Sequence, residues 1–462
     1  QTSLPYFFWI EVYLYCTFFE SSCSLVAVQS IFTWLKGPCA YPDHQSKKSF
    51  KMPKISTRGT QALDSPIRRL AAYADQAEAD GKTVYYLNIG QPDIPTPQSA
   101  LQAVRSADLS ILKYSPSTGI DSYRKKLVEY YARFSIELDY TDLIITTGAS
   151  EAISFVLSAC MDPGEKVIVP EPFYANYLGF AHTTGVKIQP ITSSIHNGFA
   201  LPNIAAFEQL IGPKTKAIFL CNPSNPTGGI YGEEELRSLA RLIKQHDLFL
   251  IVDEVYREFC YDGLDFFSVL RLDEIAEHTI VIDSISKRFS ACGARIGSVV
   301  TKNQALLTTI LKYGQIRLSP PTLGQLLGEA TLALPTSYLD DIKAEYDKRR
   351  NLMINRLQAM PEVICYWPRG AFYAFVALPI DDADRFCRWL LETFSHQGQT
   401  IMLAPGTGFY ATPGLGKQEV RLAYVINTTA LSKAMDCLEA ALAVYPHRRP
   451  IVPMPQKHSV EP

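Results

Sequence analysis

The chain has 462 residues, of which 47% are hydrophobic and 19% charged, so it is long enough for a large core and for more than one domain. Its 44 Lys and Arg residues nearly balance its 46 Asp and Glu residues, which argues against nucleic acid or an anionic membrane as a partner. None of its ten cysteines forms a C-x-x-C pair, so the sequence predicts no metal site and favours a reducing, cytoplasmic environment.

The first part of the chain differs in composition from the rest. Aromatic residues, serines and cysteines are abundant in residues 1–51, and no lysine or arginine precedes Lys36. Charged residues such as Glu11 and Glu20 interrupt the apolar stretches, so neither a signal peptide nor a membrane-spanning helix is predicted. A weak membrane anchor is one interpretation. We favour the other, in which residues 1–51 are a disordered or non-native extension and an ordinary composition resumes at Met52.

From about residue 83 to residue 300, short apolar runs alternate with longer helical stretches. Each run is apolar throughout, which is typical of strands that are buried on both faces of a mostly parallel sheet. The sequence therefore predicts an α/β fold, with strands at residues 143–146, 166–169, 217–220, 248–252, 279–282 and 296–300.

After about residue 331 the pattern changes to that of a smaller α+β domain. A long charged helix is predicted at residues 338–360, short strands at 372–377 and 419–424, and a final helix at 430–444. The predicted divisions beyond the N-terminal extension are an arm with part of the small domain (52–98), a large domain (99–330), the small domain (331–446) and a proline-rich disordered tail (447–462).

Polar residues follow several of the predicted strands, and ligands of such sheets bind beyond the carboxyl ends of the strands. The segment TTGASE at 146–151 brings small residues to a helix start, where backbone N–H groups bind anions. A plain helix cap at Ser150 is the alternative. The segment NPSNPTG at 222–228 predicts a rigid turn that presents Asn225 to a ligand oxygen, unless these residues serve the turn alone.

Two further strand ends carry charges. Asp253 follows a buried strand, where a carboxylate is costly unless it caps a helix or pairs with a cationic ligand that Tyr256 could also reach. Lys287, in SISKRFS at 284–290, would be read as a surface residue if it stood alone. The neighbouring serines and Arg295 instead suit a dianion beside an amine that could form a Schiff base.

Arg421 interrupts the apolar pattern VRLAY at 420–424. It is either an edge-strand arginine or a buried fork for a substrate carboxylate. Together, these segments supply a Schiff-base lysine, a carboxylate for a pyridinium nitrogen, a phosphate cup and a carboxylate clamp. Pyridoxal-phosphate chemistry needs that set of groups.

At this point the sequence resembles the class I and II pyridoxal-phosphate-dependent aminotransferases of fold type I, over about residues 55–444. The resemblance implies a mostly parallel central sheet with helices on both faces, a smaller α+β domain, and a homodimer with shared active sites. The motifs that carry it are LNIGQPD at 87–93, KYSPSTG at 113–119, NPTG at 225–228, SISK at 284–287, GARIG at 293–297 and GAFY at 370–373.

The resemblance also implies a role for each matching residue. Lys287 would hold the cofactor covalently and act as general base and acid, and Asp253 would pair with the pyridinium nitrogen. Tyr256 and Asn225 would bond the ring hydroxyl oxygen. The remaining roles are phosphate binding by Ala149, Ser150, Ser284 and Arg295, ring stacking by Tyr174, contact with the neighbouring subunit's cofactor phosphate by Tyr114, and substrate binding by Gly90, Asn225 and Arg421.

The substrate class rests on fewer residues. Dicarboxylate-specific members of the family often have a lysine in the phosphate-cup loop, where this chain has Ser150. Arg317, in QIRLSPP at 315–321, is a candidate for binding the distal carboxylate, and a surface or interface arginine is the alternative. Aspartate is therefore the preferred amino donor, with 2-oxoglutarate as acceptor, and aromatic or alanine-type amino acids are the alternatives.

Two other functions are alternatives. A C–S lyase or a decarboxylase on the same fold would keep Lys287 and Asp253 without exchanging amino groups. A non-catalytic regulator would carry a DNA-binding domain with a basic recognition helix, which residues 1–51 do not resemble.

Overall fold

The computed structural model describes residues 52–451. The chain divides into two compact units, Gln1–Ile55 and Ser56–Pro462. Residues 52–55 are the described part of the first unit and are exposed. The expectations for residues 1–51 thus lie outside the described residues, and the elements discussed below belong to the second unit.

A seven-stranded sheet forms the centre of this unit, in the order β2-β8-β7-β6-β5-β3-β4. β8 runs antiparallel to both of its neighbours and the other paired strands are parallel, so the predicted mostly parallel α/β fold is confirmed. The edge strand β4 was not predicted, because half of its residues are polar. The strands are β2 (Leu143–Thr146), β3 (Lys166–Glu171), β4 (Lys187–Thr192), β5 (Thr215–Cys221), β6 (Phe249–Asp253), β7 (Thr279–Ser284) and β8 (Gly297–Val300).

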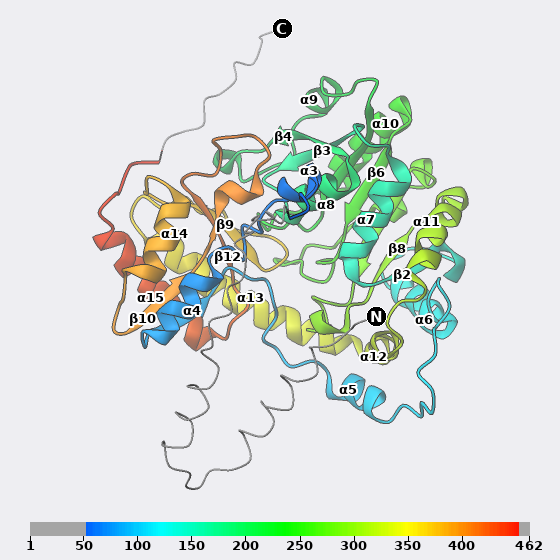
Figure 1. The fold of residues 1–462 in the computed structure, drawn as a ribbon, viewed down its shortest axis with the longest axis horizontal. Helices are drawn as coiled ribbons and strands as arrows, with labels where there is room; N and C mark the ends of the chain where they lie inside the picture. Colours follow the sequence, from blue (N-terminus) through cyan, green and yellow to red (C-terminus); the bar gives the residue numbers. More distant parts are fainter. Residues whose placement is uncertain (1–51, 452–462) are drawn as a thin grey trace, which may run out of the picture. The chain divides into compact units, whose positions relative to one another are not determined.

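Helices cover both faces of this sheet (Figure 1). In β6, Leu250 and Val252 join the core on one face, whereas Ile251 between them joins the core on the other face. This alternation explains why the strands are apolar throughout. The first core is covered by α5 (Gln98–Arg105), α6 (Asp121–Ala132), α10 (Glu233–His246) and α12 (Thr322–Leu332), and the second by α7 (Gly148–Cys160), α8 (Asn176–Thr184) and α11 (Gln304–Arg317).

A third core lies among the elements at the two ends of the described sequence. The long helix α13 (Thr336–Ala359) contacts both regions, because Tyr338 packs against the first core of the large sheet and Met353 lies in the third core. The elements of this region are β1 (Thr83–Tyr86) paired with β10 (Gln399–Met402), the antiparallel sheet of β11 (Ala404–Pro405), β12 (Glu419–Ala423) and β9 (Tyr373–Ala377), and the helices α4 (Ala71–Ala79), α14 (Ala383–Glu392) and α15 (Thr428–Val444). Two short helices, α3 (Thr57–Thr60) and α9 (Ile204–Glu208), complete the set.

The predicted domain limits stay a prediction. At the C-terminal limit, Arg448 pairs with Glu362 at 2.8 Å and forms a β-bridge with Ile380, and residues 452–462 lie outside the description. None of the helices in residues 52–451 combines the length and the apolar character that crossing a bilayer requires. The seven cysteines in the same range are free thiols.

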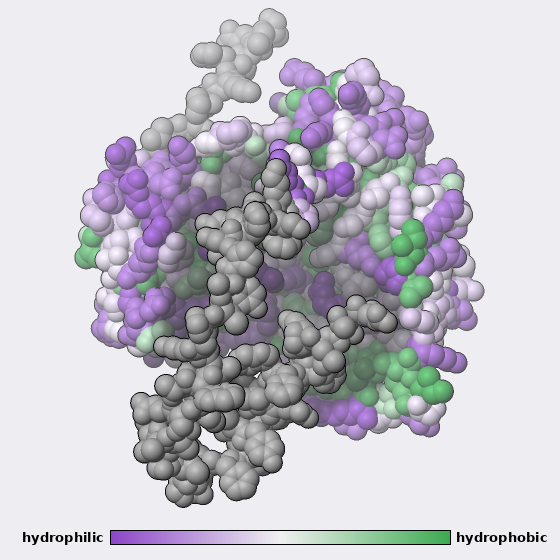
Figure 2. Space-filling view, in the orientation of Figure 1, coloured by the Kyte–Doolittle hydropathy of each residue, from purple (hydrophilic) through white to green (hydrophobic). Residues whose placement is uncertain are grey.

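One area of the surface carries several exposed apolar side chains. In Figure 2 hydrophobic residues gather where Figure 1 shows α12 and the loop after α5. Two segments supply them, and a bond of 2.6 Å from the Ser117 hydroxyl to the Leu318 carbonyl joins the segments. The most exposed members are Ile111 (75%), Leu112 (61%), Tyr114 (75%) and Ile316 (79%).

The parallel strands bring their polar ends to one edge of the large sheet. Cys221, at the end of β5, pairs in register with Asp253, at the end of β6. Asp253 in turn pairs with Ile282 of β7. The three polar segments that follow these strands therefore leave the sheet side by side, as the sequence predicts.

Candidate active site

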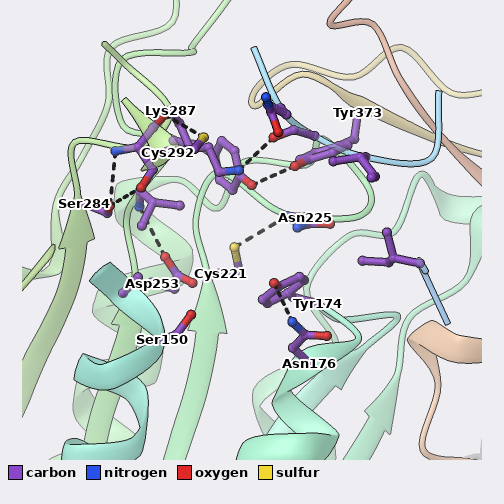
Figure 3. Close-up of a pocket in the computed structure, with 18 of the residues that line it drawn as sticks. Ser150, Tyr174, Asn176, Cys221, Asn225, Asp253, Ser284, Lys287, Cys292 and Tyr373 are labelled. Atoms are coloured by element: carbon purple, nitrogen blue, oxygen red, sulfur yellow. Dashed lines mark hydrogen bonds between the residues drawn. The ribbon is translucent and has the colours of Figure 1, made fainter. Parts of the chain in front are cut away.

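A cavity of about 660 Å³ lies at this edge of the sheet (Figure 3). Of the residues predicted to form the site, all but Tyr114 and Arg317 line it. The lining residues from that prediction are Gly90, Ala149, Ser150, Tyr174, Asn225, Asp253, Tyr256, Ser284, Lys287, Arg295 and Arg421.

Lys287 enters the cavity from the turn that follows β7. Its Nζ donates to the backbone carbonyl of Gly90 at 2.7 Å. A Cβ atom added to Gly90 would lie 1.7 Å from the hydroxyl of Tyr373, so only glycine fits at this point. The Lys287 amine therefore binds the Gly90 carbonyl at a position where residue 90 has no side chain that could block access to the amine.

Asp253 is a buried carboxylate without an ion-pair partner among residues 52–451. Its Oδ2 accepts from the Tyr177 hydroxyl at 2.9 Å, and its Oδ1 accepts from the backbone N–H of Val255 at 3.3 Å. Burial raises the pKa of Asp253 to about 6, and the bond from Tyr177 and the charge of Lys287 limit the rise. A buried carboxylate of this kind suits a ligand that presents a cationic N–H group.

Two tyrosines lie together beside Lys287. The hydroxyls of Tyr256 and Tyr373 are 2.9 Å apart, and burial raises the pKa of Tyr256 well above its usual value. Tyr256 is therefore a phenol that can donate to a ligand oxygen. Sequence reasoning quoted Tyr373 within the GAFY segment but gave it no role, and its place in the cavity comes from β9.

The start of α7 forms the anion-binding part of the cavity. α7 begins at Gly148, with Thr147 as its cap, so Ala149 and Ser150 lie in its first turn and the alternative of a cap at Ser150 is wrong. A Cβ added to Gly148 would lie 2.3 Å from a guanidinium nitrogen of Arg295, which places that cation at the helix N-terminus. A positive guanidinium beside free backbone N–H groups suits a phosphate.

Arg295 reaches this position because its own backbone is left-handed, with φ of 54°. Close packing of β8 against α7 also depends on a glycine: a Cβ on Gly297 would lie 2.5 Å from the carbonyl carbon of Gly148 and 2.6 Å from the backbone nitrogen of Ala149. The Ser284 hydroxyl lies 2.8 Å from that of Ser286, and both serines line the cavity.

Arg421 is the buried cation of the substrate side. Its side chain is 1% exposed and has no carboxylate partner in the described part of the chain. One Nη donates to Asn225 Oδ1 at 2.9 Å, the other donates to the backbone carbonyl of Asn88, and its Nε has no partner in the same residues. Tyr373 and Phe409 flank the guanidinium, with ring centres 4.5 and 5.0 Å away. A buried, unpaired guanidinium is stabilised by an anionic ligand.

The other two predicted residues lie elsewhere. Arg317 does not line the cavity: its guanidinium is 3.3 Å from the carboxylate of Glu151 and donates to the backbone carbonyl of Ser117 at 3.1 Å. Within residues 52–451 it pairs with a helix carboxylate and lies outside the cavity of its own chain. Tyr114 lies on the exposed apolar area described above.

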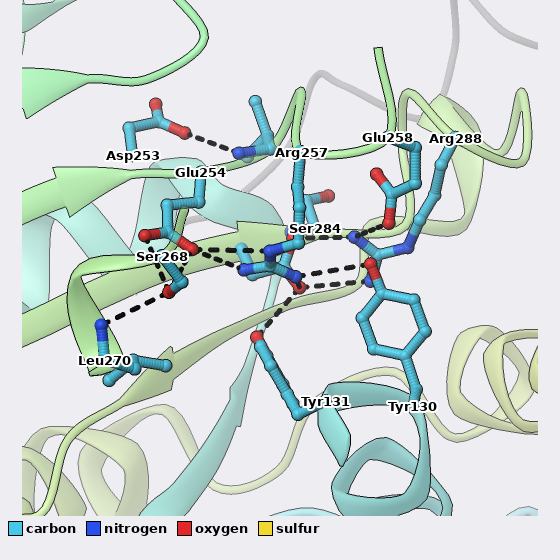
Figure 4. A network of polar contacts seen from close by, with 12 residues as sticks. Tyr130, Tyr131, Asp253, Glu254, Arg257, Glu258, Ser268, Leu270, Ser284 and Arg288 are labelled. Carbon is cyan, nitrogen blue, oxygen red and sulfur yellow. Dashed lines mark hydrogen bonds and ion pairs between the residues drawn. The ribbon is translucent and has the colours of Figure 1, made fainter. Parts of the chain in front are cut away.

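A network of buried charges lies next to the cavity-lining residues Asp253 and Ser284 (Figure 4). Arg257 pairs with Glu254 at 2.8 Å and with Asp283 at 3.3 Å. Arg288 pairs with Asp283 at 2.7 Å and lies 3.7 Å from Glu258. The network residues Glu254 and Arg288 directly follow Asp253 and Lys287 in sequence, so it ties the ends of β6 and β7 together.

Glu258 is the least satisfied member of this network, and it makes the stability of the protein depend on pH. Neither of its carboxylate oxygens has a hydrogen-bond partner in residues 52–451, and burial raises its pKa to about 7 despite the charge of Arg288. Between the ordinary pKa of 4.5 and about 7, the folded protein keeps a proton that the unfolded chain releases. Stability from this group is therefore lost as the pH rises through that window.

We therefore predict that Glu258→Gln raises the free energy of unfolding at pH 8 by about 2–3 kcal/mol and changes it little at pH 4. Urea unfolding at both pH values measures this difference. Glu362→Gln, at an exposed position, is the matched control and should have little effect at either pH. A Glu258→Gln variant that is less stable than the wild type at pH 8 would contradict the prediction.

Comparison with known proteins identifies the family of the chain. The family described as "Aminotransferase class I and II" matches residues 82–437. The chain is similar to the aspartate aminotransferase of Pyrococcus horikoshii (29% identity, 82% of this chain and 94% of that protein) and to the aromatic-amino-acid aminotransferase 2 of Thermococcus litoralis (29%, 84% and 98%). The crystal structure of the aspartate aminotransferase of Thermotoga maritima superposes with a TM-score of 0.77 at 29% identity, over 84% of this chain and 100% of that one. The chain belongs to the class I and II aminotransferase family.

Proposed function

We propose that this aminotransferase uses pyridoxal 5′-phosphate, held covalently at Lys287, to move an amino group from an L-amino acid to a 2-oxo acid. One observation supports the proposal above the others. A single cavity contains an accessible lysine amine, a buried carboxylate without a cation and a buried guanidinium without an anion. These are the groups that the cofactor and an amino acid would complete.

The lining residues fit the parts of the cofactor. The N-terminus of α7 with Arg295, Ser284 and Ser150 would hold the phosphate. Asp253 would accept from the ring N–H. Because Asn225 Oδ1 already accepts from Arg421, its amide NH₂ group would donate to the ring hydroxyl oxygen.

The aromatic residues fit the ring itself. Tyr256, as a phenol, would donate to the same ring oxygen as Asn225. Tyr174 lies in the cavity wall with its hydroxyl fixed by Asn176 at 2.8 Å, and its ring would cover the pyridine face.

The residues of the chain would then divide the chemistry between them. When bound, the cofactor supplies a ring that accepts electrons from the substrate Cα. Once the substrate amine has replaced it on the cofactor, Lys287 Nζ would take the proton from Cα as general base and deliver it as acid to the C4′ carbon of the cofactor. Asp253, ionised above about pH 6, keeps the proton on the ring nitrogen. Arg421 holds the α-carboxylate with two parallel N–H donors and so fixes which Cα bond faces Lys287.

Aspartate is the proposed amino donor and 2-oxoglutarate the acceptor. The names of two of the similar proteins support this choice, and that of the third, an aromatic-amino-acid aminotransferase, keeps aromatic substrates as the alternative. Alanine-type donors are a further alternative.

We also propose that two copies of the chain form a homodimer with shared active sites. The exposed apolar area of Ile111, Leu112, Tyr114 and Ile316 supports this proposal, because a contiguous apolar area usually marks an interface. Tyr114 belongs both to this area and to the family motif that reaches the neighbouring cofactor phosphate. The same contact would complete the phosphate site.

Lys287→Ala should abolish covalent attachment of the cofactor. Borohydride reduction of the wild-type protein saturated with pyridoxal phosphate should add one cofactor mass to the peptide that contains Lys287, because the imine becomes a stable amine. The variant should lose this adduct and its yellow colour after dialysis. An unchanged adduct in Lys287→Ala would place the cofactor on another lysine.

A panel of L-amino acids with 2-oxoglutarate should show amino transfer, with aspartate processed fastest. Glutamate formation measured by chromatography reports the reaction. Pyruvate and ammonia released without any oxo acid would instead indicate a C–S lyase.

Light scattering should give the molar mass of two chains for the wild type. Ile316→Glu should shift the population towards one chain, because a charge at the centre of an apolar interface is costly to bury. Glu392→Gln, on α14, is the control and should leave the mass unchanged. A wild type that is monomeric at micromolar concentration contradicts the proposed dimer.

A further inference from the structure

The cavity contains one more cation than the proposed chemistry uses. Its charged lining residues are Asp253, Lys287, Arg295, Arg421 and Arg68. In the proposed function, Lys287 and Asp253 bind the cofactor and its ring nitrogen. Arg295 binds the phosphate, and Arg421 binds the α-carboxylate of the substrate. Arg68 is then the lining cation in the described part of the chain that has no assigned anion.

Arg68 lies on a segment that is fixed against the cavity. The Asn88 side chain donates to the backbone carbonyl of Ile67 at 2.9 Å. Pro66 packs so closely on Gly408 that a Cβ at Gly408 would lie 2.1 Å from the Pro66 Cβ. The backbone on the N-terminal side of Arg68 is therefore held in place, although the arginine itself is exposed at the cavity mouth.

The next residue is an arginine with a different environment. Arg69 pairs with Asp384 and also donates to Thr407 at 3.3 Å. By contrast, the guanidinium of Arg68 makes no ion pair or hydrogen bond with any residue in 52–451. Of these two adjacent arginines, one is paired with Asp384 and the other is available to a ligand.

Arg68, Tyr174 and Arg421 line the same cavity. Burial raises the pKa of Tyr174 to about 12, and the charges of Arg421 and Arg68 both act in the opposite direction. The pKa of the Tyr174 phenol therefore responds to both Arg421 and Arg68.

We propose that Arg68 binds the second carboxylate of a dicarboxylic substrate and so selects C4 and C5 dicarboxylic amino and oxo acids over monocarboxylic ones. This inference rests on the proposed function, because it requires the α-carboxylate to occupy Arg421. A guanidinium matches a carboxylate through two parallel hydrogen bonds, which an alanine-type substrate cannot form. The role that Arg317 was expected to play thus passes to a residue that lines the cavity.

The test compares Arg68→Met with Arg69→Met in the holoenzyme. Methionine keeps much of the apolar side-chain volume and removes the charge, and Arg69→Met is the matched control because that arginine pairs away from the cavity. The half-reaction of each amino acid, followed by the absorption change of the cofactor in a single turnover, separates the amino donor from the acceptor. Arg68→Met should lower the second-order rate constant for aspartate by about 10- to 100-fold and leave that for alanine within about threefold.

Binding supplies a second readout. Succinate has two carboxylates and no amino group, so its dissociation constant should rise about 10-fold or more in Arg68→Met and stay unchanged in Arg69→Met. Arg68→Lys keeps the charge but loses the two-pronged contact, and it should give intermediate values.

Equal losses for aspartate and alanine in Arg68→Met, or no loss for either, would overturn the inference and leave the proposed function standing. A wild type that converts alanine or aromatic amino acids but neither aspartate nor glutamate would overturn both the inference and the choice of aspartate as donor, and would leave amino transfer itself standing. A wild type that shows no half-reaction with any amino acid would instead refute the proposed function itself.

Discussion

The geometry of the candidate site depends on the buried carboxylate of Asp283. Burial alone would raise its pKa, but Arg288 and Arg257 hold it down to about 2, so the group is ionised at every pH at which the protein is expected to work. Removing one member of such a pair leaves a buried charge uncompensated, at a cost of about 3–5 kcal/mol. The two arginines are therefore fixed, and they belong to the segments that follow β6 and β7. Lys287, next to Arg288, is positioned as a consequence.

The cavity beside this network differs from it, because buried charges within the cavity lack ion-pair partners. The charges of the network lie close to partners of opposite sign, whereas Asp253 and Arg421 within the cavity are buried without ion-pair partners among the described residues. Burying an unpaired charge is unfavourable, and a bound ligand of opposite charge removes that cost. The paired charges of the network thus fix the positions of the site residues. The unpaired Asp253 and Arg421 provide affinity for an N–H cation and a carboxylate.

Much of the fold and the centre of the site could be predicted from sequence. Parallel strands that are buried on both faces are apolar throughout, so a charge such as Asp253 stands out at the strand end. Arg317 could not be resolved in the same way, because a helix sequence does not reveal which carboxylate its side chain meets, and here it meets Glu151. A role for Tyr373 in the site was not predicted, because a tyrosine in an apolar strand has the pattern of an ordinary core residue.

No local sequence pattern predicts that the segment around Arg68 lies at the cavity. It comes to the cavity through Asn88, whose side chain donates to the Ile67 carbonyl and whose own carbonyl accepts from Arg421. A single residue therefore joins the α-carboxylate clamp to the segment that carries the second arginine. Asn88 takes part in both bonds, as donor to Ile67 through its side chain and as acceptor from Arg421 through its backbone carbonyl.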